Sequence, residues 1–457
     1  MAKENSESLE RGSFLWRFSK KFNFAAENII PDPLVFCLLL TILVFVSGVL
    51  FTDHGIMGML NSWYNGIWSQ IAFAFQMSFM VVTCAVTARS KQIKKALKKF
   101  AKVVNTPTAA IILLMAFGYI SSFLNWAFCT IVTPILAMQL TKNVKRLHFP
   151  MLVAAGYSTM NLGQCLGPSA SVYALLAGQD HFLVDKIGVL TQDVTTYNPM
   201  NVIVWLILAV GTILLTLKTM PPKNEVIEYS ANDEDEEKEV EETRNTFAEK
   251  MNGSKIIMML IGIAGLVNII FTFMKSGFLG SLSLNFVIFI FLTANFMLYN
   301  TLEKFIAAYR ENLGLATDVM IQFPFYGGIQ GMMSDSGLGQ IIVGGMCQFA
   351  TAYTLPVISY ISASIVNLFI PSQGGQWIVQ GPILVDAAIR LDANIPHVVN
   401  AFVFGDEATN LLQPLYVIPA LSVVGMKLKD VWGYMAFIWL FWCIVTIIGL
   451  LAVPGLI

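Results

Sequence analysis

Residues 354–390 constrain the fold most, because two apolar arms, each about a dozen residues long, flank a short polar stretch at 371–376. A membrane-spanning helix needs about 20 apolar residues, so neither arm crosses a bilayer alone. Pro371 removes a backbone donor, and Gly374 and Gly375 allow the chain to turn. Since broken backbone at membrane depth must be buried in protein or line a cavity, we expect a re-entrant hairpin with a polar tip. The alternative is a pair of ordinary helices joined by a loop.

The rest of the chain is also apolar. Of its 457 residues, 56% are hydrophobic and 12% are charged, and runs of spanning length recur from Leu34 to the C-terminus. This composition indicates a multi-pass, all-α protein surrounded by membrane lipid. No strongly basic face points to nucleic acid as a partner. The six cysteines are isolated from one another, so we expect neither a metal site nor a disulfide framework.

Basic amphipathic segments come before the first apolar hairpin. Residues 1–30 mix aromatic and basic side chains at roughly helical spacing, as in a segment that lies on the inner membrane face. Residues 89–102 carry seven positive charges, with Ile93, Leu97 and Phe100 on the opposite side. Because positively charged segments are retained in the cytoplasm, we expect the N-terminus on the cytoplasmic side of the membrane.

A first hairpin and a first broken helix follow. Residues 107–141 are too many for one span and too few for two spans and a turn, and positive charges flank both ends. They predict a re-entrant hairpin that enters from the cytoplasm. Residues 151–177 could span the membrane, but polar residues at 158–164 and the sequence Gly-Pro-Ser at 167–169 interrupt them. This pattern predicts a helix that is broken near its centre.

An acidic stretch separates the two halves of the chain. We divide the sequence into an amphipathic segment at 1–30, a first repeat at 31–220, an acidic cytoplasmic linker at 221–254 and a second repeat at 255–457. The second repeat contains the hairpin at 354–390 and a broken helix at 398–421. With this topology, all but three of the 28 Lys and Arg residues lie on the inner side, an asymmetry that supports the orientation.

Polar residues recur in the same order in the two halves. Each hairpin contains a Ser-x-x-Asn pattern and each broken helix contains a Thr and an Asn, namely Ser122 with Asn125, Ser364 with Asn367, Thr159 with Asn161, and Thr409 with Asn410. The first hairpin is expected to enter from inside and the second from outside, so the repeats would be inverted. Inverted repeats with broken helices are typical of alternating-access transporters, whose binding site lies at the repeat interface.

The expected site is polar and mostly uncharged. The chain has no P-loop and no nucleophile–base cluster, so it predicts neither ATP-driven transport nor an enzyme. Backbone N–H groups at hairpin tips suit a carboxylate, and neutral oxygens suit Na⁺ as a coupling ion; no other cofactor is expected. The candidate substrate-binding residues are Ser121, Ser122, Asn125, Trp126, Thr159, Asn161, Ser372, Gln373, Gly374, Gly375, Gln376, Thr409, Asn410 and Gln413.

Ion coupling is assigned to a second, overlapping set. Asp406 and Glu407 lie in the second broken helix, and ionisable groups at membrane depth are functional by default. Either could carry a proton or hold a cation, unless both lie in water near the outer end of the helix. The candidate ion-coupling residues are Asn125, Asn161, Ser364, Asn367, Asn410, Asp406 and Glu407.

Several motifs resemble the bacterial short-chain fatty acid transporter family, which belongs with the ion transporter superfamily. They are Pro31-Asp-Pro-Leu34, the sequence at 322–328 with Ser336-Gly-Leu-Gly339, the hairpin tip at 371–377 with Gln380-Gly-Pro382, and Asn410 to Pro414. The resemblance covers nearly the whole chain from Pro31. It implies paired hairpins, a scaffold domain against a moving transport domain, a homodimer and an elevator-like motion.

The resemblance also implies uptake of short monocarboxylates such as butyrate or acetoacetate. In the family the hairpin tip usually reads Pro-Ser-Gly-Gly-Gly-His-Trp. Here Gln373 stands in place of a Gly and Gln376 in place of the His. The identity of the substrate and any proton step through that His are therefore not carried over.

We expect a secondary active transporter of short-chain fatty acids, coupled to sodium or to protons. The alternatives are a passive anion channel and a transporter of another small carboxylate or dicarboxylate. A channel would give flux without accumulation against a gradient, which distinguishes it from a symporter.

Overall fold

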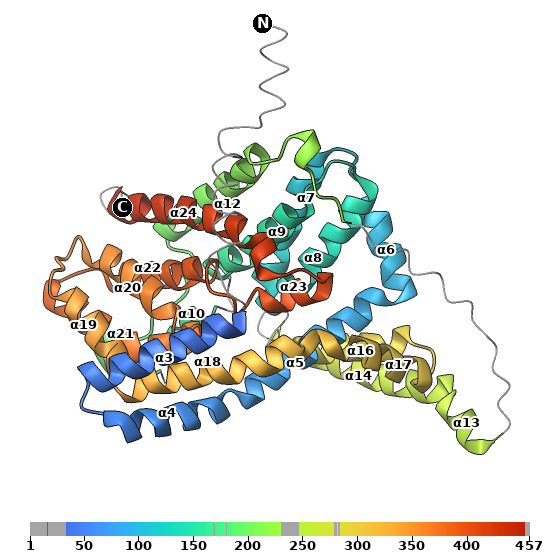
Figure 1. Ribbon diagram of the computed structural model, residues 1–457, viewed down its shortest axis with the longest axis horizontal. Helices are drawn as coiled ribbons and strands as arrows, with labels where there is room; N and C mark the ends of the chain where they lie inside the picture. The colour runs from blue at the N-terminus through green and yellow to red at the C-terminus, as the bar shows by residue number, and fades with distance from the viewer. Residues whose placement is uncertain are drawn as a thin grey trace, which may run out of the picture.

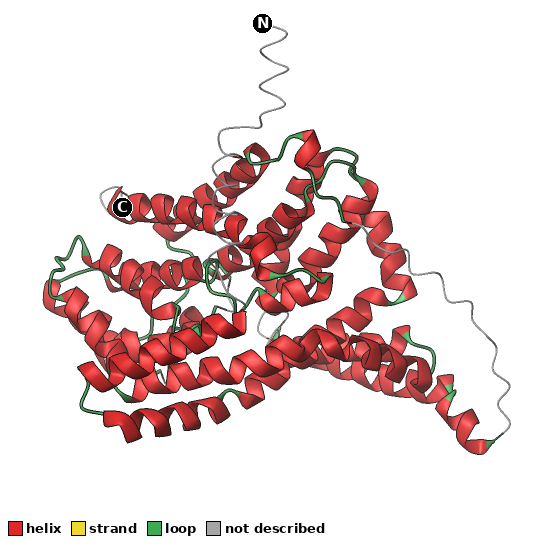
Figure 2. Cartoon of the chain, in the orientation of Figure 1, coloured by secondary structure: helices red, strands yellow, loops and turns green. Residues whose placement is uncertain are grey.

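The computed structural model describes Trp16 and residues 33–167, 170–179, 181–229, 246–277, 281 and 284–452. Every regular element in these residues is a helix (Figure 2). Five helices are long and apolar enough to cross a membrane: Pro33–Phe51, Gly55–Arg89, Pro199–Lys218, Phe247–Ser276 and Leu428–Ala452. The prediction of an all-α protein with several apolar helices is confirmed. Apart from Trp16, the predictions for residues 1–30 fall outside the described residues, as does the acidic run at 233–242.

The first half contributes ten α-helices among the described residues (Figure 1). They are α3 (Pro33–Phe51), α4 (Gly55–Ser69), α5 (Ile71–Arg89), α6 (Lys91–Ala101), α7 (Pro107–Leu124), α8 (Trp126–Asn143), α9 (Phe149–Gln164), α10 (Ser171–Leu176), α11 (Val184–Ile187) and α12 (Pro199–Lys218). The predicted hairpin at 107–141 corresponds to α7 and α8. The predicted broken helix at 151–177 corresponds to α9 and α10, and part of its break, residues 168–169, lies outside the described residues.

The second half begins after a short 3-10 turn, η1 (Lys223–Glu225), and the acidic linker. Its described elements are α13 (Phe247–Asn252), α14 (Lys255–Ser276), α16 (Leu284–Leu298), α17 (Leu302–Asn312), η2 (Leu313–Ala316), α18 (Thr317–Asp335), α19 (Leu338–Cys347), α20 (Leu355–Asn367), α21 (Gln373–Leu391), α22 (Ile395–Thr409), α23 (Ile418–Val424) and α24 (Leu428–Ala452). The second hairpin is α20 with α21, and the second broken helix is α22 with α23.

The helices follow one another in the same order in both halves. The series α5, α6, α7, α8, α9, α10 and α12 matches the series α18, α19, α20, α21, α22, α23 and α24 in order and in kind: long helix, amphipathic helix, hairpin, broken helix and closing helix. Gln76 and Gln322 are each the sixth residue of the first helix in their series. This order agrees with the predicted repeat, and the opposite orientation of the two halves in the membrane remains a prediction.

The helical segment formed by α4 and α5 is longer than its apolar pattern indicates. The apolar run in the sequence covers residues 66–88, but the helix begins at Gly55 and continues with one break, at Gln70, to Arg89. The polar residues Asn61, Ser62 and Asn65 hid its first part because they interrupt the apolar pattern. Of these three, only Ser62 is buried, on the side of α4 that packs along α18 (Figure 1), whereas Asn61 and Asn65 are exposed.

Glycines allow α4 and α18 to approach very closely. A Cβ atom added at Gly66 would overlap the carbonyl oxygen of Gly327, and one added at Gly327 would lie 2.5 Å from the carbonyl oxygen of Gly66. A Cβ atom at Gly331 would overlap the carbonyl oxygen of Ser62. Backbones in contact are typical of membrane helices whose interface consists of small residues. The α4–α18 pair is therefore a rigid seam between the two halves.

We expect Gly327→Val to destabilise the protein strongly, because the new side chain would collide with backbone that cannot rotate away. Overpacking of this kind costs about 1–3 kcal/mol or more. The unfolding temperature of the purified protein in detergent should fall, with Gly345→Val as the matched control. Gly345 also lies in a helix, but nothing surrounds its Cβ position within 4 Å. Equal unfolding temperatures for the two variants would contradict the close α4–α18 contact.

Residues 225–229 pack on the turn between α8 and α9 through His148. The Nδ1 atom of His148 accepts the N–H of Ile227 at 3.0 Å, and its Nε2 lies 2.6 Å from the Tyr434 hydroxyl. Trp16 stacks on Tyr434, with 6.1 Å between the ring centroids. Because a backbone N–H can only donate, Nδ1 carries no proton and the ring is neutral. Burial lowers the pKa of His148 to about 4, although the negative charge of Glu225 acts in the opposite direction.

The sign of this shift predicts a loss of stability in weak acid. A pKa below the ordinary value of about 6.5 means that the unfolded chain binds the proton more readily. The stabilisation of the fold by neutral His148 is complete above about pH 6.5. It is lost as the pH falls toward 4, and the whole loss is about 3 kcal/mol. The unfolding temperature should therefore drop further between pH 7.5 and pH 5 in the wild type than in His148→Gln, which does not titrate. Equal drops would contradict a buried, neutral His148.

Candidate functional site

The tip of the first hairpin is formed at Asn125, between α7 and α8. Its backbone is extended, with φ −163° and ψ 128°, which separates the two helices. Its side-chain oxygen accepts the N–H of Phe128 at 3.1 Å and so caps the N-terminus of α8. Asn is a preferred residue at this position because its short side chain satisfies a free backbone donor. The hairpin tip is therefore also the start of a helix.

The same tip is bound to α9 just before the break in that helix. Ser122 Oγ donates to the carbonyl of Met160 at 2.7 Å. A Cβ atom at Gly163 would overlap Ser122, and one at Gly118 would overlap Thr159, so α7 and α9 are in direct contact. The Thr159 hydroxyl donates to the carbonyl of Gly156 in its own helix. The structure thus places Ser122 of the first hairpin against the part of the first broken helix that contains Thr159.

The second hairpin turns earlier than the sequence indicated. We expected the tip at 371–376, with Gly374 and Gly375 providing the turn, but α21 begins at Gln373 and the turn lies at 368–372. Ser372 caps α21 by accepting the N–H of Gly375 at 3.4 Å. The cap and Pro371 begin the helix before the glycines, which lie in its first turn. Neither glycine has a positive φ angle.

The two glycines serve close contacts instead of a turn. A Cβ atom at Gly374 would lie 3.4 Å from Cβ of Ser171 at the start of α10. One at Gly375 would lie 2.8 Å from the amide nitrogen of Gln330 on α18. Gln330 in turn accepts a hydrogen bond from Gln70, at the break between α4 and α5. The first turn of α21 therefore lies between α10 and the α4–α18 pair.

Asn367 connects the second hairpin to the second broken helix. Its amide nitrogen lies 2.7 Å from the carbonyl of Asp406, 3.0 Å from Thr409 Oγ1 and 2.9 Å from Asn410 Oδ1. The side chain is fully buried, and its own oxygen has no hydrogen-bond partner. Asn125 and Asn367 occupy equivalent places in the sequence repeat, yet Asn125 caps its own hairpin whereas Asn367 reaches across to α22.

Glu407 belongs to the same network. Its two carboxyl oxygens accept hydrogen bonds from Gln373 at 3.1 Å and from Asn410 at 3.1 Å. Gln373 also accepts the N–H of Val172 at 3.1 Å, which ties α21 and α22 to α10. Gln413 donates to Asn410 at 3.0 Å and completes the group. Hydrogen bonds therefore bring together Asn367, Gln373, Glu407, Thr409, Asn410 and Gln413, which we call the amide network.

Asp406 is buried beside the amide network with no partner for its side chain. Only 1% of its surface is exposed, and neither carboxyl oxygen makes a hydrogen bond. The ion pairs among the described residues lie elsewhere on the molecule. A buried, ionised carboxylate without a partner is very costly, so this group requires a cation or a proton. The alternative that Asp406 and Glu407 lie in water at the outer end of the helix is wrong.

The two broken helices are joined directly. The Tyr157 hydroxyl on α9 donates to the carbonyl of Asn410 at 2.8 Å. One turn further along α9, Asn161 is fully buried beside this hydroxyl, and neither of its amide atoms makes a well-formed hydrogen bond. The Trp126 ring meets Tyr416 edge-on, with centroids 5.3 Å apart. Asn161, Trp126 and the amide network thus approach one another from the two halves.

Tyr157 and Tyr416 were missed by the sequence analysis. A tyrosine in an apolar helix looks like an ordinary packing residue, so the sequence around Tyr157 did not indicate a functional role. The four-residue spacing from Tyr157 to Asn161 places both on one face of the helix and could have indicated a shared role. Tyr416 follows the motif from Asn410 to Pro414 and has no regular spacing to reveal it.

Three other predicted site residues make hydrogen bonds outside the amide network. Ser121 donates to Gly118 in the same helix, and Ser364 donates to the Gly405 carbonyl on α22 without reaching the amide network. Gln376 donates to Ala363 and Gln380, all within the second hairpin. Ser121 and Gln376 stabilise their own hairpins, whereas Ser364 ties the second hairpin to α22 at the residue before Asp406.

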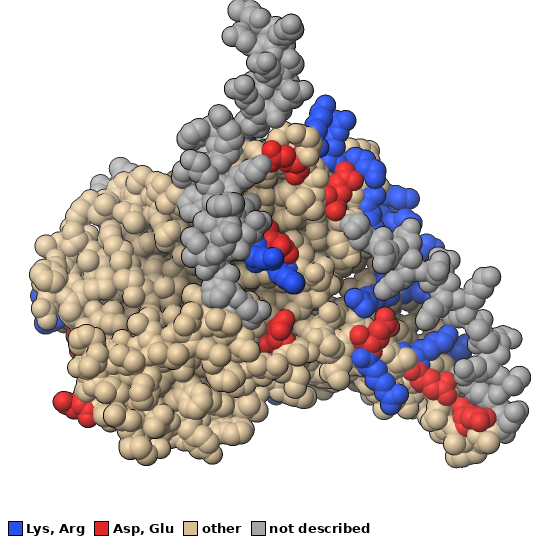
Figure 3. All heavy atoms as spheres, viewed as in Figure 1, with Lys and Arg blue, Asp and Glu red and all other residues tan. Residues whose placement is uncertain are grey.

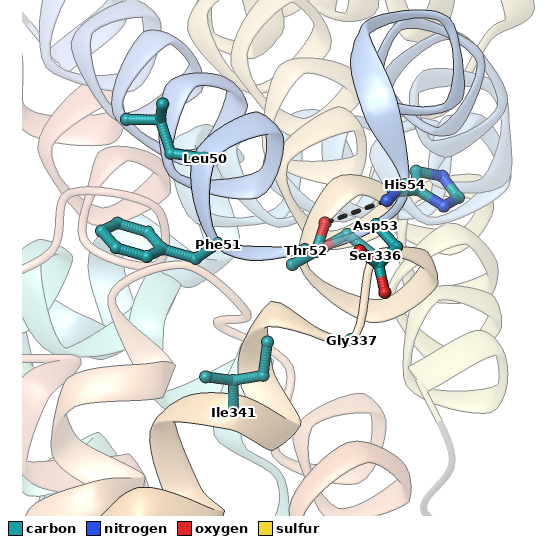
Figure 4. Close-up of a pocket in the computed structure, with 8 residues that line it drawn as sticks. All are labelled: Leu50, Phe51, Thr52, Asp53, His54, Ser336, Gly337 and Ile341. Atoms are coloured by element: carbon teal, nitrogen blue, oxygen red, sulfur yellow. Dashed lines mark hydrogen bonds between the residues drawn. The ribbon is translucent and has the colours of Figure 1, made fainter.

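A separate hollow lies away from these residues. Its volume is about 650 Å³, and it opens between the α3–α4 turn and the α18–α19 turn (Figure 4). It is lined by Leu50, Phe51, Thr52, Asp53, His54, Ser336, Gly337 and Ile341. The only hydrogen bond drawn between these residues joins the His54 N–H to the Thr52 hydroxyl, at 3.3 Å. None of the predicted site residues lines this hollow.

Comparison with known proteins identifies the family. A family model described as short chain fatty acid transporter matches residues 14–453. A protein of Escherichia coli (strain K12) with the name "Putative short-chain fatty acid transporter" is 30% identical over 438 residues, which are 95% of this chain and 98% of that protein. A protein of Haemophilus influenzae with the same name is 29% identical over 444 residues, 95% and 99% of the two chains.

A solved structure is similar over the same extent. The Alcanivorax borkumensis YdaH transporter aligns with 93% of this chain and 99% of its own, at 15% identity and a TM-score of 0.46. The family match is much stronger and spans every described helix. It confirms the prediction of a transporter that is not an enzyme: the chain belongs to the short-chain fatty acid transporter family.

Proposed function

We propose that the protein is a secondary active symporter of short-chain monocarboxylates, such as butyrate or acetoacetate, driven by sodium or protons. The observation that carries this proposal is Asp406, a buried carboxyl group without a partner beside two broken helices. Such a group changes its free energy sharply when a cation or proton joins it, because the charge is no longer uncompensated. A passive pathway has no need of it.

The substrate carboxylate is expected at the hairpin tips. Both tips are helix N-termini, one capped by Asn125 and the other by Ser372, and helix N-termini favour anions through their free N–H groups. The amide network holds no Lys or Arg, so a bound carboxylate relies on these dipoles and on the coupling cation. The helix N-termini and one coupling cation compensate one negative charge better than two, which favours a monocarboxylate over a dicarboxylate as the substrate.

The coupling cation is expected near Asp406. Oxygen atoms that lack a hydrogen-bond partner lie on Asp406, on Asn367 and on Asn161, all of which are buried. Hard cations such as Na⁺ prefer carboxyl and amide oxygens of this kind. If the coupling ion is a proton, Asp406 alone would carry it and the amide oxygens would contact the substrate.

For the transport cycle we propose two inverted repeats, with re-entrant hairpins that close the site from opposite sides of the membrane. The repeated order of helices and the strong asymmetry of positive charge support this topology, with the N-terminus in the cytoplasm and the chain in the inner membrane. The family further suggests an elevator-like motion of a transport domain in a homodimer. The close contact between α4 and α18 suits a scaffold that stays fixed while the transport domain moves.

A counterflow experiment distinguishes monocarboxylate from dicarboxylate substrates. Proteoliposomes preloaded with unlabelled butyrate should take up labelled butyrate transiently, and external acetoacetate or propionate should compete. Succinate should not compete, because its second carboxylate has no partner in the amide network. Equal competition by succinate and propionate would contradict the assignment to monocarboxylates.

A further inference from the structure

α6 presents a row of lysines along one side. The spacing of three and four residues places them on one helical face, and all are exposed: Lys91, Lys94, Lys95, Lys98, Lys99 and Lys102. The helix carries no acidic residue. Figure 3 shows Lys and Arg side chains gathered along this edge of the molecule. We call this row the lysine face.

The opposite side of α6 is attached to the first hairpin. The Phe100 and Phe117 ring centroids are 6.0 Å apart, and Asn143 at the end of α8 donates to the carbonyl of Ala101 at 2.9 Å. Ser90 caps the helix by accepting the N–H of Ile93. These contacts hold α6 in place by its apolar side and its ends, so the lysine face points away from the hairpin.

The acidic linker starts beside the C-terminal end of α6. Tyr229, the last described residue before the linker gap, lies under the Lys142 ammonium, 5.9 Å from its ring centroid, and packs on Phe149 at 4.8 Å. Lys142 is next in sequence to Asn143, whose amide bonds Ala101 in the last turn of α6. The path of the linker therefore begins at one end of the lysine face.

The linker ends at the helix pair that contacts the other end of α6. Gln92 in the first turn donates to the carbonyl of Leu298, at the end of α16. α16 packs on α14, where a Cβ atom at Gly262 would lie 2.8 Å from the Met297 side chain. α14 begins a few residues earlier in the chain, directly after α13 and the linker. The lysine face thus lies between the two anchor points of the linker.

Length and charge both fit this face. Residues 230–245 can span about 50 Å when extended, at roughly 3.3 Å per residue, whereas the 11 residues of α6 are only about 16 Å long. The linker carries a dense acidic run, composed of Asp233, Glu234, Asp235, Glu236, Glu237, Glu239, Glu241 and Glu242. We propose that residues 233–242 dock on the lysine face of α6 and act as its counter-charge within the same chain.

The interaction would be a loose electrostatic contact, not a rigid fit. One exposed ion pair contributes only about 0.2–1 kcal/mol, so docking depends on many pairs acting together. One exposed ion pair, Lys145 with Glu228 at 3.9 Å, lies at the start of the linker. Such a contact is strongly screened by salt, because the Debye length falls from about 8 Å at 0.15 M to about 3 Å at 1 M. Docking would also keep the lysine face from binding anionic lipid headgroups.

Zero-length carbodiimide crosslinking of the full chain in neutral detergent tests the proposal. We expect amide crosslinks between residues 233–242 and the α6 lysines at low salt, and their loss in 1 M NaCl. The Lys186–Asp386 pair, with 2.6 Å between Nζ and Oδ1, is set by the fold and serves as the internal control. If that control crosslink forms and the linker crosslinks do not, or if the linker couples only to Lys250 and Lys255, the proposal is wrong.

Proteolysis provides an independent measurement without crosslinker. A Glu-specific protease should cleave the linker several-fold faster after Lys94, Lys95, Lys98 and Lys99 are all changed to Gln than in the wild type. Changing Lys250 and Lys255 to Gln should leave the rate unchanged. In vesicles that contain phosphatidylglycerol, wild-type protection should persist; rapid cleavage there, with the α6 lysines shielded from acylation, would assign the face to lipid and overturn the proposal.

Discussion

Asn367→Ala is expected to abolish uptake while leaving the protein folded. The side-chain amide of Asn367 has two N–H groups, which donate hydrogen bonds to three acceptors on the second broken helix. Without these hydrogen bonds the second hairpin is no longer held to the second broken helix, and because a misplacement of about 1 Å at a site can cost roughly a hundredfold in rate, kcat/KM for uptake should fall by that factor or more. Initial uptake of labelled butyrate into proteoliposomes measures the effect. Asn125→Ala should also abolish uptake, through loss of the cap on α8.

Asn295→Ala is the matched control for both substitutions. Asn295 is likewise fully buried and bonds Thr83, Thr87 and Tyr309, but it lies between α5, α16 and α17, outside the site. It should lower the unfolding temperature and retain uptake per folded molecule. If Asn367→Ala and Asn125→Ala transported normally, the assignment of the site would be wrong. If Asn295→Ala lost uptake equally, the losses would reflect stability alone.

Asp406→Asn is expected to eliminate ion-driven accumulation without reducing stability. The substitution keeps the shape of the side chain and removes a carboxyl group that makes no hydrogen bond, so folding loses no contact. The variant should bind substrate but no longer concentrate it under a sodium or proton gradient. Accumulation in proteoliposomes and the unfolding temperature in detergent are the two measurements.

Glu407→Gln separates the roles of the neighbouring acids. Both oxygens of Glu407 accept amide hydrogens, so a Gln would place its own NH₂ group against one of these donors. We expect this variant to lose stability as well as uptake, unlike Asp406→Asn. Accumulation that survived in Asp406→Asn would exclude this carboxyl group as the coupling residue.

The helices α7–α8, α9–α10, α20–α21 and α22–α23 begin and end within a few residues of the stretches that the sequence marks as hairpins and broken helices, and the re-entrant path of the hairpins stays a prediction. Length was the decisive signal: an apolar stretch such as 107–141 fits neither one span nor two, and the helices α7 and α8 meet inside it. The repeated Ser-x-x-Asn and Thr–Asn patterns led to the residues that meet around α9 and α22. Periodicity of polar residues in an apolar chain is informative because each buried polar group needs a partner.

The failures have a common physical cause, since sequence shows which residues are polar but not which backbone approaches them. Gly374 and Gly375 looked like a turn, whereas the structure uses their missing side chains for contacts with Ser171 and Gln330. The first part of α4 looked too polar to be part of a span, and the sequence did not show that Ser62 packs against α18. Asn125 and Asn367 were equivalent in sequence, and only the structure shows that one caps a helix and the other bridges two segments.

We propose that transport is coupled to an ion through the buried group around Asp406. The most direct test of this coupling is the uptake of labelled butyrate into proteoliposomes, first under an inward sodium gradient and then under an inward proton gradient. We predict accumulation above the equilibrium level under one of these gradients, and its loss in Asp406→Asn. Equilibration without accumulation under both gradients would show a passive pathway and contradict the claim.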